Sequence, residues 1–218
     1  MVSKYMAEAI ATFFLVFIGA GTAIAFPNGI LEIALATGLA LMVGVYATAH
    51  ISGGHVNPAV TAGMWVTKRI SSREAFIYII SQLIGAVSAG IFLLYVYPAQ
   101  PANLGATDLA ADISLGAGTL VETVLTFLLV FVVFALTADR RAPRSVYGAA
   151  IGLTVTASIL MAGPLTGAAL NPARAFGPAV AAWYWNNHVV YWIGPIIGGI
   201  VAGLVYSRFF LKNVRRKR

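Results

Sequence analysis

Cysteine is absent from this 218-residue sequence, and charged residues are scarce. Without a thiol, the chain has no disulfide, no thiolate metal ligand and no cysteine nucleophile, which excludes redox chemistry by cysteine. Charged residues make up 10% of the chain and hydrophobic residues 60%, whereas soluble domains have about 25% and roughly 45–50%. A chain with this composition is expected to be a membrane protein.

Long hydrophobic runs supply the expected spanning segments. A helix needs about 20 residues to cross the hydrocarbon core of a bilayer. Runs of this kind occur at 9–31, 33–49, 75–97, 113–138, 145–170 and 175–207. We therefore expect an all-α membrane protein with six transmembrane helices. No charged leader with a cleavage site precedes the first run, so we expect that span to remain in the protein.

Basic residues are missing from three of the connections, and this decides how the net charge of +7 is interpreted. The loops near 26–32, 97–116 and 183–190 contain no Lys or Arg. The basic residues instead fall at alternate connections and at the termini: Lys4; Lys68, Arg69 and Arg73; Arg140, Arg141 and Arg144; and the tail from Arg208 to Arg218. The positive-inside rule then predicts cytoplasmic termini. The charge therefore indicates contact with membrane lipid and not with nucleic acid.

The chain repeats itself at a shift of 114 residues. The segment AEAIATFFLVF (7–17) matches VETVLTFLLVF (121–131), which aligns Glu8 with Glu122. We place the first repeat at about 1–100 and the second at about 115–218, within one transmembrane domain, 1–218. Each repeat has three spans, an odd number, so the second is inverted in the membrane. Inverted repeats build a site near the bilayer midplane from broken helices.

The same shift relates two Asn-Pro-Ala triplets. They are Asn57, Pro58 and Ala59, and Asn171, Pro172 and Ala173. Asparagine is a preferred N-cap and proline is favoured at the first helical position, so each triplet is expected to begin a short helix. We predict two re-entrant half-helices, in segments at about 51–66 and 163–182, whose positive N-termini meet near the centre. Irregular backbone at that depth requires protein partners or a water-filled path.

Glu8 and Glu122 are carboxyl groups within the first and fourth spans. We expect each to accept hydrogen bonds from the re-entrant loop of its own half, because that loop contains backbone amides without helical partners. The alternative is proton coupling through these acids in an inverted-repeat secondary transporter. An enzyme is not favoured, since no acid orients Ser52 and His55 as a nucleophile and base. His50 and His55 lack a third ligand, so we expect neither metal nor cofactor.

With both triplets, both glutamates and the inverted halves present, the sequence resembles the aquaporin and glycerol-facilitator family, the major intrinsic proteins, over essentially its whole length. The segment HISGGH before the first triplet and Arg174 after the second strengthen the resemblance. It implies a passive water channel that excludes protons and ions. It also implies a homotetramer with one pore per subunit. In such a pore Asn57 and Asn171 would donate hydrogen bonds to one central water.

The resemblance further implies a selectivity filter toward the outside, formed by Thr37, Ile159, Ala168 and Arg174. Arg174 is the one basic residue expected on the outer side, and a role as pore donor and cation barrier accounts for it. Strict water channels usually carry an aromatic residue at the first of these positions and histidine at the second. The filter of this chain is therefore expected to be wider and more apolar.

Two further departures bear on the permeant and on the source. Glycerol facilitators typically have tryptophan at position 37 and aspartate at position 175, where this chain has Thr37 and Ala175. Water is the main expected permeant, with small neutral solutes such as glycerol, ammonia or dissolved gases beside it. Ile159 resembles archaeal members of the family, which favours a prokaryotic plasma membrane. In the family, the residue at His50 lines the cytoplasmic half of the pore and that at His55 supports the loop.

Small and aromatic residues near the spans lead to two expectations about packing. Small residues on the third and sixth spans allow helices to approach closely and are expected to join the two halves. They are Gly85, Ala89, Gly90, Gly198, Gly199, Ala202 and Gly203. Aromatic residues near the outer end of the last span are expected to form an interfacial belt. They are Trp183, Tyr184, Trp185, Tyr191 and Trp192.

Overall fold

The computed structural model describes residues 2–139 and 141–211, and within these ranges the regular structure is helical. The α-helices are α1 (Val2–Ala25), α2 (Ile30–Ser52), α3 (Pro58–Val66), α4 (Ser72–Val96), α5 (Leu115–Val133), α6 (Tyr147–Thr166), α7 (Pro172–Ala182) and α8 (Val190–Val205). Short helical turns add η1 (Pro101–Gly105), η2 (Phe134–Ala138), η3 (Arg144–Val146) and η4 (Tyr206–Phe210). Arg140 and most of the basic tail lie outside the described residues.

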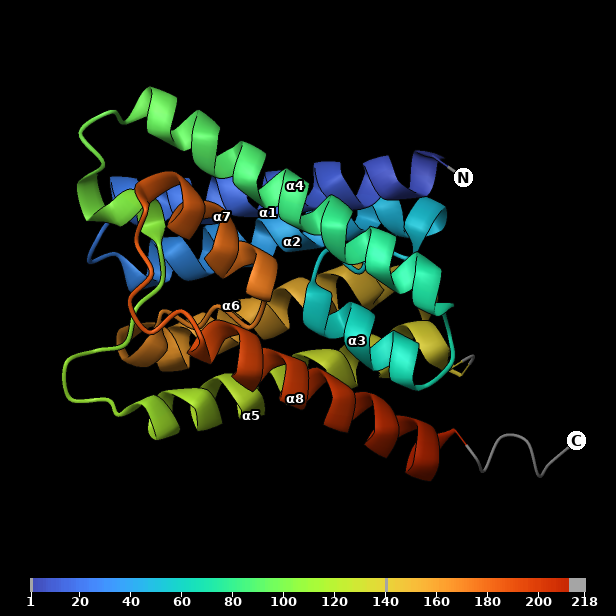
Figure 1. Ribbon diagram of the computed structural model, residues 1–218. Helices are drawn as coiled ribbons and strands as arrows, with labels where there is room; N and C mark the ends of the chain where they lie inside the picture. The colour runs from blue at the N-terminus through green and yellow to red at the C-terminus, as the bar shows by residue number, and fades with distance from the viewer. Residues whose placement is uncertain (1, 140, 212–218) are drawn as a thin grey trace, which may run out of the picture.

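Six of these helices are long and apolar enough to cross a membrane, in agreement with the expected number. They are α1, α2, α4, α5 continued by η2, α6, and α8 continued by η4. The order long, long, short, long occurs twice, from α1 to α4 and from α5 to α8. Figure 1 shows the start of α1 and the end of α8 at one end of the bundle, and the α4–α5 and α7–α8 connections at the other.

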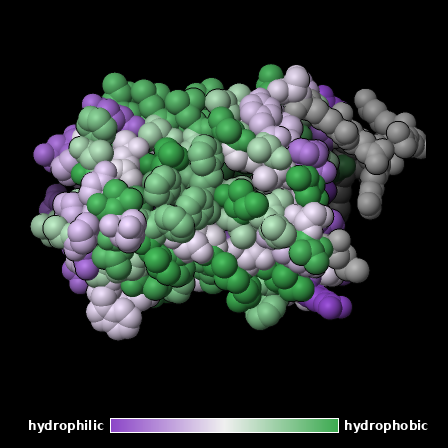
Figure 2. Space-filling model, turned by 90° about the horizontal axis from the view of Figure 1, so that it is seen from above, coloured by the Kyte–Doolittle hydropathy of each residue, from purple (hydrophilic) through white to green (hydrophobic). Residues whose placement is uncertain are grey.

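The exterior of the bundle is suited to lipid. Large hydrophobic side chains are exposed along the outward faces of the spans, among them Leu39, Ile84, Leu128 and Leu160. Figure 2 shows hydrophobic residues across the middle of one face, with hydrophilic residues gathered toward the two ends. This distribution is the one required of a multi-pass membrane protein, whose apolar band faces hydrocarbon while its ends face water.

The boundaries of the first and last expected spans were wrong. The run 9–31 corresponds to α1, which begins at Val2 and ends at Ala25. Its polar first turns do not interrupt the helix, because Lys4 forms an ion pair with Glu74 (3.0 Å) and Glu8 is fully buried. The run 175–207 contains two elements, because the part of α7 after Arg174 consists mainly of apolar residues and lies close to α8 in the sequence. Hydropathy alone does not separate α7 from α8.

The third and sixth spans join the two halves through their small residues, as expected. Each holds the half-helix of the other repeat, so that α3 packs on α8 and α7 on α4. A Cβ at Gly199 would lie 2.4 Å from the Ala59 carbonyl oxygen, and one at Gly90 would lie 2.5 Å from the Gly177 oxygen. Gly85 and Gly198 instead face the first helices of their own halves. Gly90 and Gly199 therefore allow the half-helices to pack closely against the spans.

Candidate functional site

Both Asn-Pro-Ala triplets begin a helix, as expected. Asn57 is the N-cap of α3, and its side-chain oxygen accepts a hydrogen bond from the Ala59 amide (2.8 Å). Asn171 caps α7 in the same way, accepting from the amides of Ala173 (3.0 Å) and Arg174 (3.4 Å). The proline of each triplet occupies the first helical position, where its missing N–H leaves no helical bond unmade.

The asparagine of each triplet is also hydrogen-bonded to the residue that precedes the other triplet. The Asn57 amide nitrogen donates to the Leu170 carbonyl, and the Asn171 amide nitrogen donates to the Val56 carbonyl, both at 2.8 Å. Val56 and Leu170 have φ angles of 54° and 53°, unusual for side chains of their size. An amide nitrogen carries two hydrogens, so each asparagine keeps one hydrogen for a further acceptor.

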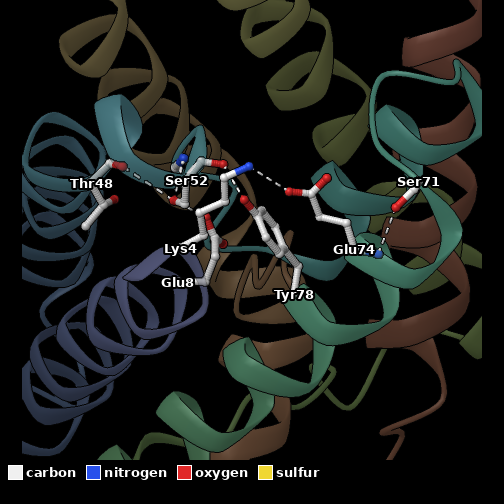
Figure 3. A network of polar contacts seen from close by, with 8 residues as sticks. Lys4, Glu8, Thr48, Ser52, Ser71, Glu74 and Tyr78 are labelled. Carbon is white, nitrogen blue, oxygen red and sulfur yellow. Dashed lines mark hydrogen bonds and ion pairs between the residues drawn. The ribbon is translucent and has the colours of Figure 1, made fainter. Parts of the chain in front are cut away.

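Glu8 supports the first re-entrant loop through both of its oxygens, as expected. One oxygen accepts from the Ser52 hydroxyl (2.7 Å) and the His55 amide (2.9 Å). The other accepts from the Val56 amide (2.7 Å) and the Gln82 side chain (2.8 Å). Figure 3 shows Ser52 from the end of α2 meeting Glu8 from α1. The buried carboxylate thereby satisfies loop donors that no helix provides for.

Glu122 does the same for the second loop. Its first oxygen accepts from the Thr166 hydroxyl (2.7 Å) and the Ala169 amide (3.0 Å), and its second accepts from the Leu170 amide (2.8 Å). These three bonds repeat those of Glu8 at the 114-residue shift. The position that corresponds to Gln82 is Pro195, which has no side-chain donor. Glu8 therefore accepts one hydrogen bond more than Glu122.

Two tyrosines that were not predicted as site residues connect these loops to the neighbouring spans by hydrogen bonds. The hydroxyl of Tyr78 donates to the Ser52 carbonyl (2.7 Å), visible in Figure 3, and that of Tyr191 donates to the Thr166 carbonyl (2.8 Å). Both tyrosines are buried, so assigning Tyr191 to an exposed aromatic belt was wrong. The repeat register would have identified the pair, because Tyr78 and Tyr191 align at the 113-residue shift of the third and sixth spans.

A narrow internal cavity runs along the two triplets. Its volume of about 20 Å³ exceeds the ~10–15 Å³ that one water requires. The polar side chains on its wall are Thr37, His55, Asn57, Asn171 and Arg174. Most of the other residues that line it are apolar, among them Leu15, Leu41, Val45, Val60, Leu129, Val133, Ile151 and Val155. Such a lining offers a few hydrogen-bonding groups among apolar side chains, which suits the passage of small neutral molecules.

Two of the four expected filter residues lie on this cavity, Thr37 and Arg174. The Thr37 hydroxyl is buried without a hydrogen-bond partner among the described residues, so a molecule in the cavity can supply one. Arg174 is only 6% exposed and donates to the Gly105 carbonyl (2.8 Å). Ile159 and Ala168 are buried but are not among the residues lining the cavity. Their part in a filter stays a prediction.

The two histidines near the first triplet have different surroundings. His55 lines the cavity, and its Nδ1 lies 3.1 Å from the Thr61 hydroxyl oxygen. That hydroxyl also contacts the Asn57 carbonyl and the Gln82 amide nitrogen. All three contacts are satisfied together only if Nδ1 of His55 is the donor, which leaves Nε2 as an acceptor. His50 is exposed and lines a separate, open pocket beside Gly53 and Tyr147.

No group of three His, Asp or Glu side chains in the described ranges is arranged to hold a metal ion. The polar groups of the site are instead hydrogen-bond donors and acceptors fixed by the backbone. Such an arrangement can orient a small molecule in the cavity, and it brings two helix N-termini to the same place, where positive potential accumulates.

Comparison with known proteins agrees with this geometry. The sequence model described as "Major intrinsic protein" matches residues 1–206. The chain is 41% identical to a probable TIP-type aquaporin of Medicago truncatula, in an alignment that covers 97% of this chain and 88% of that protein. It is 45% identical to the probable aquaporin TIP2-1 of Oryza sativa subsp. japonica, over 96% and 88% of the two chains.

Animal and structural relatives extend this finding. Aquaporin-4 of Mus musculus is 41% identical over 97% of this chain and 68% of its own length. The fold is similar to that of the X-ray structure of the aquaglyceroporin from Plasmodium falciparum, with a TM-score of 0.87, 24% identity and 99% of each chain covered. With its doubled Asn-Pro-Ala half-helices and this extent of similarity, the chain belongs to the major intrinsic protein family.

Proposed function

We propose that this chain forms a passive transmembrane pore for water that excludes ions and protons. The observation that carries the proposal is the pair of capped half-helices, whose asparagine amides meet at one narrow cavity inside a six-span bundle. Family membership and the aquaporin relatives support the same function. No catalytic step is part of the proposal.

Exclusion of ions follows from the charges around the cavity. The N-termini of α3 and α7 each carry a partial charge of roughly half an elementary charge, and Arg174 adds a full positive charge on the same lumen. A cation entering the cavity meets these charges without its hydration shell. The remaining amide hydrogens of Asn57 and Asn171 hold a water by its oxygen. That water cannot accept a proton and pass it along the chain of waters.

The hydrogen bonds of the two buried acids argue against the transporter alternative. Every oxygen of Glu8 and Glu122 accepts from a backbone amide of its own re-entrant loop. An oxygen that took up a proton would face those amides with reduced acceptor capacity, and the loop would lose support. A proton carrier needs a group whose protonated form is tolerated, so these carboxylates act as fixed acceptors.

The test is light scattering on proteoliposomes mixed rapidly with an impermeant osmolyte, with protein-free liposomes as reference. We expect fast shrinkage, and no collapse of a pH gradient imposed across the same vesicles. The same vesicles in a glycerol gradient measure whether a larger neutral solute follows. Shrinkage no faster than that of protein-free liposomes, or dependence on a counter-ion gradient, would refute the pore.

Thr37→Phe is expected to narrow the pore. An aromatic ring at this position fills part of a cavity that already holds little more than water. We expect the permeability to glycerol to fall about tenfold, equivalent to ~1.4 kcal/mol in the barrier, while water permeability falls less. Leu39→Phe is the matched control, since Leu39 lies on the same helix but faces lipid. An unchanged ratio of glycerol to water permeability in Thr37→Phe would remove Thr37 from the filter.

Location and assembly remain part of the proposal. The protein is a multi-pass membrane protein, and we infer cytoplasmic termini from the basic residues at the end of the bundle where α1 begins. The plasma membrane and the prokaryotic source stay predictions, since the similar proteins named above come from plants, a mouse and Plasmodium falciparum. We also infer a homotetramer set in membrane lipid, with one pore in each subunit.

A further inference from the structure

The guanidinium of Arg174 depends on a loop from outside its own half-helix. It donates a hydrogen bond to the carbonyl of Gly105, at the end of η1 in the α4–α5 connection. Gly105 is packed so closely on α1 that a Cβ there would lie 2.5 Å from the Ala20 carbonyl oxygen. The position of this connection therefore decides where the guanidinium sits in the cavity.

Asp108, three residues after Gly105, links the same connection by hydrogen bonds to the loop that follows α7. One carboxylate oxygen accepts from the Asn187 side chain (2.8 Å) and the Leu109 amide (2.8 Å). The other accepts from the hydroxyl of Tyr184, which itself accepts from Asn186. These partners lie in the α7–α8 connection, a few residues beyond the helix that carries Arg174.

The contacts form a closed circuit. It runs from Arg174 on α7 to Gly105, along the chain to Asp108, and back through Tyr184 and Asn187 to the end of α7. The α4–α5 connection has a further attachment where the Ala110 amide donates to the Leu165 carbonyl (2.9 Å) on α6. Within residues 105–110, Asp108 supplies the side-chain contacts that fix the connection to the α7–α8 loop.

We propose that Asp108 is a positioning residue for the selectivity filter, holding the Gly105 carbonyl where it fixes the guanidinium of Arg174 in the lumen. The inference rests on the proposed function, because it assigns Arg174 to the filter of a pore. Without the Asp108 carboxylate, the connection loses its tie to the α7–α8 loop and the guanidinium gains freedom to move. The filter then admits solutes larger than water more readily.

The surroundings of Asp108 in the folded protein favour its ionised form. Burial opposes its ionisation, but hydrogen bonds from Tyr184, Asn187 and Leu109 outweigh burial and hold the pKa of this carboxyl below its ordinary value. A lowered pKa means that the charged contact is complete above the ordinary value for aspartate and is lost only as pH falls through the lowered one. The contact is therefore intact throughout the neutral range in which vesicles are assayed.

The test compares Asp108→Ala with Asp112→Ala, an exposed aspartate of the same connection. Water and glycerol permeability are measured on proteoliposomes, and the unfolding temperature in detergent. We expect Asp108→Ala to raise the ratio of glycerol to water permeability by about three- to tenfold, which lies within the range of coupling between residues of one polar network. Asp108→Asn should restore part of the original ratio, because its amide still accepts from Asn187 and donates to the Tyr184 oxygen.

A double-mutant cycle with Arg174→Ala distinguishes positioning from general loosening. If Asp108 acts through Arg174, Asp108→Ala changes the ratio in the wild type but not in the Arg174→Ala background. An equal change in both backgrounds, or a parallel loss of both permeabilities with a lower unfolding temperature, would overturn the inference. If Asp108→Ala does not fold, Tyr184→Phe removes one donor alone and is expected to shift the ratio in the same direction; no shift would count against the inference.

The failure of the proposed function has a different signature. Wild-type vesicles that shrink no faster than protein-free liposomes would overturn the pore itself, and the inference with it. Water conduction with an unaltered ratio in Arg174→Ala would leave the pore standing and remove Arg174, and therefore Asp108, from the filter.

Discussion

Glu8→Ala is expected to abolish the folded state or come close to it. The substitution leaves the backbone amides of His55 and Val56 without acceptors in a site that is fully buried. Each buried unpaired donor costs roughly 1–3 kcal/mol, so the two amides alone cost ~2–6 kcal/mol. Ser52 and Gln82 lose their acceptor as well. We expect little protein to survive extraction in detergent.

Glu8→Gln tests the carboxylate more specifically than Glu8→Ala, because glutamine preserves the size of the side chain. Each carboxylate oxygen accepts one backbone amide, from His55 or from Val56. The NH₂ group of glutamine must face one of them in either orientation, so one amide remains unpaired. We expect an intermediate loss, about 1–3 kcal/mol, read as a lower unfolding temperature. Glu32→Gln, at an exposed site, is the control. Equal stability of Glu8→Gln and wild type would disprove the role of the carboxylate.

Gly199→Ala is expected to be strongly destabilising, although Ala is ordinarily better than Gly inside a helix by about 1 kcal/mol. The new methyl would lie 2.4 Å from the carbonyl oxygen of Ala59, which is backbone and cannot turn away. Relief requires α8 and α3 to separate, and overpacking of this kind costs typically ~1–3 kcal/mol or more. Because Ala59 belongs to the first triplet, we also expect water permeability to fall sharply.

The matched control is Gly116→Ala, on α5, where a Cβ meets nothing within 4 Å. There the helical preference acts alone, so stability should stay the same or rise slightly. The comparison is made by thermal unfolding of both variants in the same detergent, followed by vesicle shrinkage assays. If the two substitutions had effects of the same sign and size, the inference that α3 packs tightly on α8 at Gly199 would be wrong.

The sequence predicts the central part of this protein well, because the chain describes it twice. The 114-residue shift aligns Glu8 with Glu122 and one triplet with the other, and the short helices with their N-caps follow from local rules. Inversion follows from the odd number of spans in each half. These features depend on local residue order and on repetition, which a sequence displays directly.

Features that depend on partners distant in the chain were harder to predict. Gln82 is 74 residues from Glu8, and nothing in a hydrophobic helix marks one glutamine as a ligand of one carboxylate. Tyr191 was placed in an aromatic belt because tyrosine is frequent at membrane interfaces, yet its hydroxyl serves the Thr166 carbonyl. The apolar run 175–207 also combined most of α7 with α8, because the residues of α7 after Arg174 are mainly apolar.

The exchange of half-helices has a consequence for how the protein is made. Ribosomes deliver the chain from the N-terminus, so α3 emerges long before α8, whose Gly199 forms part of its seat. Until the last helix enters the bilayer, the first half holds a short helix that cannot reach its final packing. The final packing of α3 is therefore a late event, whereas α4 is already present when α7 emerges, and a nascent chain that stops before α8 leaves the first half-helix without its packing partner.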